Sequence, residues 1–329
     1  MPHSGPIYGV ARIRVLEKGL IGKARMQRLR DASGEECLKL LVEMGYGNTA
    51  DTGSVSVEEL IVSELTKTRD LIDEVTPDKA LTDLFVLEYD VTALKLFLKL
   101  RLIKSAENPL LVKGVYDTEQ LRQAVLKSEY SFLPEAFRNA LYELEKSFES
   151  GVDPKRISVE LDKAYMLHAL GALEGTKYED AKRYFSALAD FNNVLALLRL
   201  RRMGAASDEF SAYFLPGGEL TEKMLYEAYD LQEEQMAKAL NFGKSGKAIE
   251  KGVTETVRQG KISALEKARD DFLIAIAREG KQDIDTIRPI LGFLLAKEQE
   301  AKCIRLIVTG KRNRLDGQVI TERLRDLYG

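Results

Sequence analysis

The chain has 329 residues, with 49 basic and 52 acidic side chains and a formal net charge of −3. Hydrophobic residues make up 45% and charged residues 31%, with 8 prolines and no tryptophan, which is typical of an ordered, helix-rich protein and excludes disordered and collagen-like classes. Because both signs of charge are mixed along the chain, no overall field favours nucleic acid or lipid headgroups, and we expect protein partners.

Cysteine usage and hydropathy narrow the class further. Cys37 and Cys303 lie far apart in the sequence, which predicts neither a disulfide framework nor a zinc cluster and suits a reducing cytoplasm. No stretch approaches the ~20 apolar residues that span a bilayer, since the richest, 91–103, is interrupted by Thr92, Lys95 and Lys99. The first residues also lack a signal-peptide pattern, so we expect any membrane association to run through another protein.

Apolar residues recur at helical spacing along almost the whole chain, and alternating runs rich in Val, Ile and Thr are nearly absent, which predicts an all-α protein. Glycine and proline predict loops at 45–53, 108–109, 215–218 and 310–317. In chain order, the predicted helices are 58–74, 78–104, 118–127, 134–149, 154–173, 178–203, 221–241, 261–279, 283–309 and 318–327.

An internal repeat with a period of about one hundred residues is the most informative feature of the sequence. Its landmarks are a Leu-x-Lys that opens a helix, an acidic residue within the next helix, a glycine-containing turn and a Thr-Glu pair that opens another helix. Leu-x-Lys occurs at 65–67, 161–163 and 265–267. The acidic residues are Asp90, Asp190 and Glu298. The Thr-Glu pairs are at 118–119, 221–222 and 321–322.

Three tandem copies of one helical unit predict three similar domains, which we place at 1–116 with an N-terminal lead, at 117–217 and at 218–329. A ring or funnel with approximate threefold symmetry is the economical arrangement of such domains.

The acidic landmark shares a helical stripe with an arginine eleven positions later, with apolar residues between them. The pairs are Asp90 with Arg101 and Asp190 with Arg201. Eleven residues rise about 16 Å, so the two charges of one stripe cannot pair with each other. Two interpretations stay open: the charges tie neighbouring helices of one domain together at the rim of its core, or they line a surface that meets another subunit.

Catalytic patterns are absent from the sequence. A Gly-Lys-Ser at 243–245 lacks the first glycine of a phosphate loop, where Lys238 stands, and no predicted strand precedes it. The histidines are His3 and His168, and His168 lies on an apolar helix as core residues do. No Ser-His-Asp set or metal-ligand spacing can be assembled from them, so we expect no catalysis, no metal and no cofactor.

The second copy of the repeat carries a family resemblance. Its Asp190, Asn193, Leu197, Arg199 and Arg201 follow a D-x-x-N-L-x-x-L-L-R-x-K pattern, with Val194 for one leucine and arginine for the last lysine. The first copy departs from the pattern at Ala93. Further matching segments are 11–16, 214–218, 297–305 and 320–325, so that the whole chain resembles the C subunits of prokaryotic V/A-type ATP synthases, which are relatives of the d subunit of eukaryotic vacuolar ATPases.

The resemblance implies a funnel of three similar helical domains whose foot rests on the membrane ring of proteolipid rotor subunits and whose mouth holds the central stalk. Such a protein is a non-catalytic, peripheral rotor part on the cytoplasmic side, without cofactor, that transmits torque between ATP turnover and proton or sodium movement. Candidate partner contacts are Arg101, Arg199, Arg201, Lys302, Arg305, Lys311 and Arg312.

Two other classes make different predictions. A helical-repeat scaffold with unrelated partners would form an open solenoid with a continuous concave groove. A small-molecule enzyme would need a pocket with converging titratable groups, and the two isolated histidines argue against it.

Overall fold

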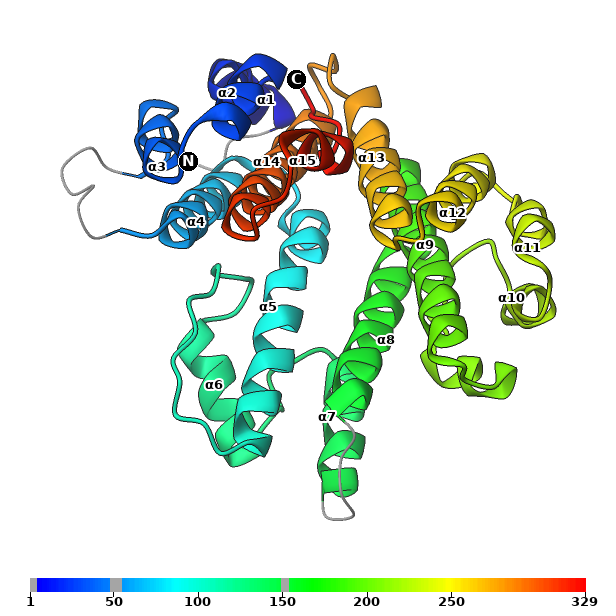
Figure 1. Ribbon diagram of the computed structural model, residues 1–329. Coiled ribbons are helices and arrows are strands. Elements are labelled where there is room, and N and C mark those ends of the chain that lie inside the picture. Colours follow the sequence, from blue (N-terminus) through cyan, green and yellow to red (C-terminus); the bar gives the residue numbers. More distant parts are fainter. Residues whose placement is uncertain (1–4, 48–54, 149–153) are drawn as a thin grey trace. The chain divides into compact units, whose positions relative to one another are not determined.

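The structure is a computed structural model that describes residues 5–47, 55–148 and 154–329. Over these residues it contains fifteen α-helices, two 3-10 helices and no strand, which confirms the all-α prediction (Figure 1). None of the described helices is long and apolar enough to cross a bilayer. The contacts divide the chain into two compact units, and the division passes through two continuous helices, α5 (Lys79–Leu102) and α13 (Ser263–Glu279).

Unit 1 combines both ends of the described chain: residues 5–85, 110–112 and 274–329. Its central pair is α4 (Val57–Val75) with α14 (Arg288–Arg312), against which the shorter helices pack. Its other elements are α1 (Pro6–Leu16), η1 (Glu17–Gly19), α2 (Lys23–Asp31), α3 (Gly34–Glu43), the first turns of α5, the end of α13 and α15 (Gly317–Arg323).

Unit 2 is made of residues 86–109 and 113–273. The hairpin of α7 (Glu135–Phe148) and α8 (Pro154–Leu173) and the long helix α9 (Glu179–Met203) form its frame. Besides the remainder of α5 and the start of α13, its other elements are α6 (Thr118–Lys127), η2 (Ser207–Tyr213), α10 (Glu222–Tyr229), α11 (Glu233–Ala239) and α12 (Gly246–Gln259).

Side-chain caps fix where several helices begin. Ser33 and Ser56 open α3 and α4 with complete capping boxes, in which the hydroxyl accepts from the backbone N–H three residues on and the glutamate there accepts from the serine N–H. Asp117 caps α6, and Thr221 caps α10. The predicted Thr-Glu start is therefore confirmed at 221–222, whereas the pair at 321–322 lies inside α15, which Asp316 caps instead.

The predicted helices differ from the structure most before residue 57 and between residues 221 and 259. The sequence pattern predicts no helix before residue 57, where α1, α2 and α3 lie, because α1 has apolar residues on both sides and α2 buries only Met26 and Leu29. The predicted helix 221–241 is two helices, α10 and α11, and the pattern misses α12. The end of the predicted helix at 149 and most of the loop 45–53 lie outside the described residues.

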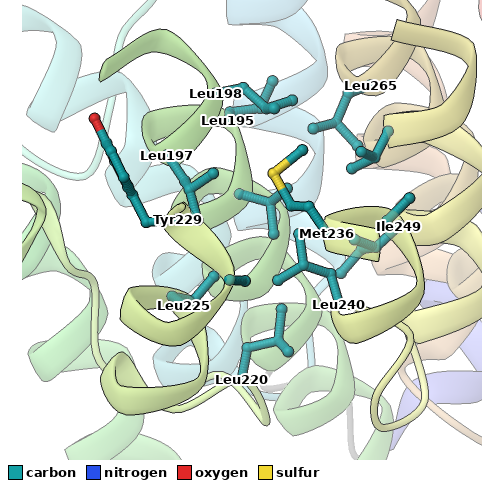
Figure 2. Close-up of a cluster of buried hydrophobic side chains, with 14 of the residues drawn as sticks. Leu195, Leu197, Leu198, Leu220, Leu225, Tyr229, Met236, Leu240, Ile249 and Leu265 are labelled. Atoms are coloured by element: carbon teal, nitrogen blue, oxygen red, sulfur yellow. The ribbon is translucent and has the colours of Figure 1, made fainter. Parts of the chain in front are cut away.

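Each unit has its own hydrophobic core. In unit 2, α9 is buried along most of its length and packs against α10, α11 and α12, where Figure 2 shows Leu197, Met236 and Ile249 pointing into the space that these helices share. In unit 1, α2, α3 and α4 pack on the second half of α14 around Leu41, Ile61 and Ile304. Burial of such leucine and isoleucine side chains stabilises each unit by about 1.5–3 kcal/mol per residue.

Candidate functional site

The first acidic landmark, Asp90 on α5, is buried and binds the chain just ahead of α6. Its carboxylate oxygens accept from the backbone N–H of Val115 at 2.7 Å and of Tyr116 at 3.2 Å. These two residues directly precede Asp117, the N-cap of α6. A carboxylate at this place satisfies backbone donors and faces the positive end of the helix, so it fixes where α6 begins.

The second landmark, Asp190 on α9, repeats this arrangement. It is fully buried and accepts from the N–H of Leu220 at 2.9 Å, from the N–H of Glu219 and from the hydroxyl of Ser245 at 3.0 Å. Leu220 directly precedes Thr221, the N-cap of α10. Burial raises the pKa of Asp190, and these three donors oppose the rise.

The third copy uses Glu300, so the predicted landmark Glu298 was wrong by two residues. The buried Glu300 carboxylate on α14 accepts from the N–H of Ile21, which directly precedes Gly22, the N-cap of α2. It also accepts from the Tyr46 hydroxyl at 3.0 Å. The third short helix therefore comes from the N-terminal part of the chain.

A basic residue eleven positions after each buried acid binds near the other end of the short-helix segment. Arg101 donates to the carbonyl of Val125 and to Ser128, the C-cap of α6. Lys311 donates to the carbonyl of Ala32, the C-cap of α2. In the second copy, Arg201 donates to Met236 Sδ in α11 at 2.9 Å, and its charge acts on Tyr229, the last residue of α10.

The same turn then ends all three long helices in the same register. Three residues after the base, the chain adopts the left-handed conformation at Lys104, Gly204 and Arg314. Each time the next residue donates its N–H back to the carbonyl one residue before the base, at 2.9–3.1 Å. The acid, the base and the left-handed turn thus recur at the same spacing on α5, α9 and α14. In the third copy, Glu300 is the acid that gives this spacing.

We call each acid and its base an acid–base clamp. An acid at the start and a base at the end of a short helix complement the helix dipole. The three acids, and the bases Arg101 and Lys311, also satisfy backbone groups that the helix leaves without partners. The internal bonds of Arg101, Arg201 and Lys311 support the interpretation that these charges tie neighbouring helices together.

The other four candidate contacts lie differently. Arg199 on α9 has an exposed fraction of 55% and pairs with Glu266 at 2.8 Å. Arg305 on α14, 40% exposed, pairs with Glu58 at 2.6 Å. Lys302 and Arg312 are exposed on α14. Four of the seven candidates belong to α14 in unit 1 and three to unit 2.

A groove of ≈ 740 Å³ lies within unit 2. The C-terminal part of α5, the start of α8, the second half of α9, η2 and α13 line it, and Arg199 is the one candidate contact on its wall. Sequence reasoning missed its other main lining residues, because they come from separate segments of the chain. Met203, with an exposed fraction of 64%, lies at the end of the otherwise buried helix α9.

The Gly-Lys-Ser segment is engaged within the protein. The N–H of Lys244 donates to Glu219 at 2.6 Å, and the Ser245 hydroxyl donates to Asp190. His168 is half-buried on α8, with its ring edge-to-face on Phe137 at 6.1 Å, so it lies at the border of the core and not within it. His3 lies outside the described residues. No group of three or more metal-binding side chains occurs in the described part of the chain.

The model of the ATP synthase (C/AC39) subunit family matches residues 9–323. The chain belongs to this family. Its C/AC39 membership makes it a component of a rotary ATPase complex and not an enzyme in its own right.

Curated relatives match over most of the chain's length. The chain is similar to the C subunit of an A-type ATP synthase of Methanosarcina mazei, with 24% identity over 96% of this chain and 92% of the relative. The corresponding A-type protein of Halorubrum lacusprofundi is 23% identical over 98% and 97%. The C subunit of a V-type sodium ATPase of Enterococcus hirae is 21% identical over 82% of both chains. The predicted resemblance is thereby confirmed.

Proposed function

We propose that this C/AC39 protein is the non-catalytic coupling subunit of its rotary ATPase, which links the central stalk to the membrane ring of proteolipid rotor subunits and transmits torque for ATP-coupled proton or sodium transport. The observation that carries the proposal is the family match over residues 9–323, which leaves no room for a separate catalytic domain among the matched residues. A rotor part of this kind lies peripherally, on the cytoplasmic side of the membrane.

We further propose three similar helical domains in a pseudo-threefold funnel. The three acid–base clamps support this proposal because they place acid, base and terminal turn at the same spacing on α5, α9 and α14. The division at 1–116, 117–217 and 218–329 stays a prediction, to which the clamp on α14 adds that α2 completes the third domain.

Torque transmission needs a rigid body, and the clamps suit this requirement. The first and third clamps hold one short helix, α6 or α2, at both ends with charges on one long helix, and the second ties the start of α10 and the helix α11 to α9. These short helices cannot slide without breaking bonds to buried groups. The exposed bases Arg199, Lys302 and Arg312 stay candidates for partner contact, and we retain Arg305 as a candidate on its half-exposed pair with Glu58.

The test uses membranes from cells that lack the chain and are complemented with tagged versions. With the native chain, we expect stalk and ring subunits to co-purify and ATP hydrolysis to drive ion movement into membrane vesicles. Without it, we expect hydrolysis that moves no ions. Unchanged ion movement in membranes without the chain would refute the coupling role.

A further inference from the structure

The groove of unit 2 carries an unequal set of charges. Four cations line it against two carboxylates: Lys99, Lys155, Arg199 and Arg269 against Glu88 and Asp162. The carboxylate of Asp162 is occupied, since Lys95 binds it at 2.5 Å from outside the lining. Arg199 and Arg269 have carboxylate partners outside the lining, Glu266 and Asp270, so the charge that an occupant meets depends on the contacts of each cation.

Two of the cations face the groove with capacity to spare. The Lys99 ammonium donates to the hydroxyl of Ser158 at 2.8 Å, a neutral partner that leaves the positive charge uncompensated at that contact. Arg199 pairs with Glu266 through Nη2 at 2.8 Å, its side chain is more than half exposed, and a guanidinium has five N–H donors, so this pair does not use all of them. Arg269 is different, because Asp270 and Asn192 hold it inside the unit.

Apart from Ser158 and Asn192, the rest of the lining is mainly apolar. Val159, Ala196, Leu200 and Leu215 contribute aliphatic surface, and Tyr213 adds an aromatic ring. Met203 stands at the edge with an exposed fraction of 64%. An exposed methionine is an adaptable contact, and an apolar floor with cations on its wall is complementary to an amphipathic segment that carries carboxylates.

The volume indicates how much of a partner fits. A helix about 10 Å across that rises 1.5 Å per residue fills roughly 120 Å³ per residue, so ≈ 740 Å³ accommodates about six residues, or one and a half turns. The exposed Met203 and Arg199 show that an occupant stays partly in solvent, whereas pockets for small ligands enclose most of the ligand.

We infer that this groove docks one and a half turns of an amphipathic, acidic helix of a partner subunit, with apolar side chains on Leu200 and Met203 and carboxylates at Lys99 and Arg199. The inference rests on the proposed function, since the partner belongs to the ATPase complex that the chain couples.

The experiment is site-specific photo-crosslinking in the assembled ATPase purified from native membranes. A benzophenone amino acid replaces Met203, and the matched control carries it at Leu167, which is 53% exposed on α8 and does not line the groove. We expect Met203 to crosslink to a helical, acidic segment of another subunit, identified by mass spectrometry, and Leu167 not to reach that segment. A crosslink from Met203 to a basic or non-helical segment, or none at all in an assembled complex, would overturn the inference and leave the proposed function standing.

Charge reversal supplies the second measurement. We expect Arg199→Glu to weaken binding of the chain to complexes depleted of it about tenfold, and changing the crosslinked carboxylate to lysine to restore most of the loss. Arg202→Glu is the control, because Arg202 is exposed on the same helix and does not line the groove. Equal losses for both variants would count against the groove. Failure of the unaltered chain to bind would overturn the proposed function and the inference with it.

Discussion

Asp190 offers the sharpest test of the acid–base clamp. Its carboxylate has no exposed surface and accepts from two backbone N–H groups and one hydroxyl. In Asp190→Ala all three donors lose their acceptor, and each buried unsatisfied group costs about 1–3 kcal/mol. Removing a carboxylate whose burial is itself costly offsets part of this sum. We therefore expect the free energy of unfolding to fall by about 3 kcal/mol.

Urea denaturation followed by circular dichroism measures this loss, and hydrogen exchange at the Leu220 amide locates it. Asp190→Asn keeps one acceptor oxygen and should lose roughly half as much. The control is Glu227→Ala on the exposed face of α10, where we expect a change within about 0.5 kcal/mol. An Asp190→Ala variant as stable as the control, with unchanged exchange at Leu220, would refute the clamp.

Three further predictions concern stability, each measured by thermal or urea unfolding. Gly218→Ala places a Cβ against the carboxylate of the second clamp and should cost about 2 kcal/mol, whereas Gly19→Ala, with nothing within 4 Å, should be neutral. Lys104→Gly and Arg314→Gly relieve left-handed backbone and should each stabilise by about 0.5–1 kcal/mol; a loss would contradict the turn. Burial lowers the pKa of His168 below its usual 6.5, so stability falls as the pH drops below 6.5, and His168→Phe should flatten this dependence.

Helix type was predictable because the apolar period of long helices is strong. The segments 78–104 and 178–203 were predicted within three residues of α5 and α9 at both ends, since both helices bury residues along most of their length. The prediction missed the N-terminal helices for the opposite reason. In α2 only Met26 and Leu29 are buried, too few for a period, and what places this helix is its contact with α14, which no local pattern shows.

For the candidate site, the sequence predicted which charged residues need partners better than it predicted where those partners lie. The spacing of Asp90 and Arg101 correctly required each to find a partner elsewhere. Asp90 binds backbone N–H groups ahead of α6, and Arg101 binds the Val125 carbonyl near the end of α6 and the Glu145 carboxylate on α7. The backbone partners are ones that a sequence read for side-chain pairs does not reveal. The groove is lined by residues from five elements, so no contiguous sequence motif predicts it. Arg199 was named because it belongs to the family pattern, and the structure adds its neighbours.

The misplacement of the third landmark has a physical cause. Counting along the sequence assumes that each short helix follows its long helix, as α6 follows α5 and α10 follows α9. At α14 the carboxylate that binds ahead of a short helix is Glu300, and its helix, α2, lies nearly three hundred residues earlier. The third clamp therefore joins the two ends of the chain, through Glu300 to Ile21 and Lys311 to Ala32. A repeat completed in this way cannot form until α14 is present, so the same bonds that repeat the clamp also join the N-terminal and C-terminal parts of unit 1.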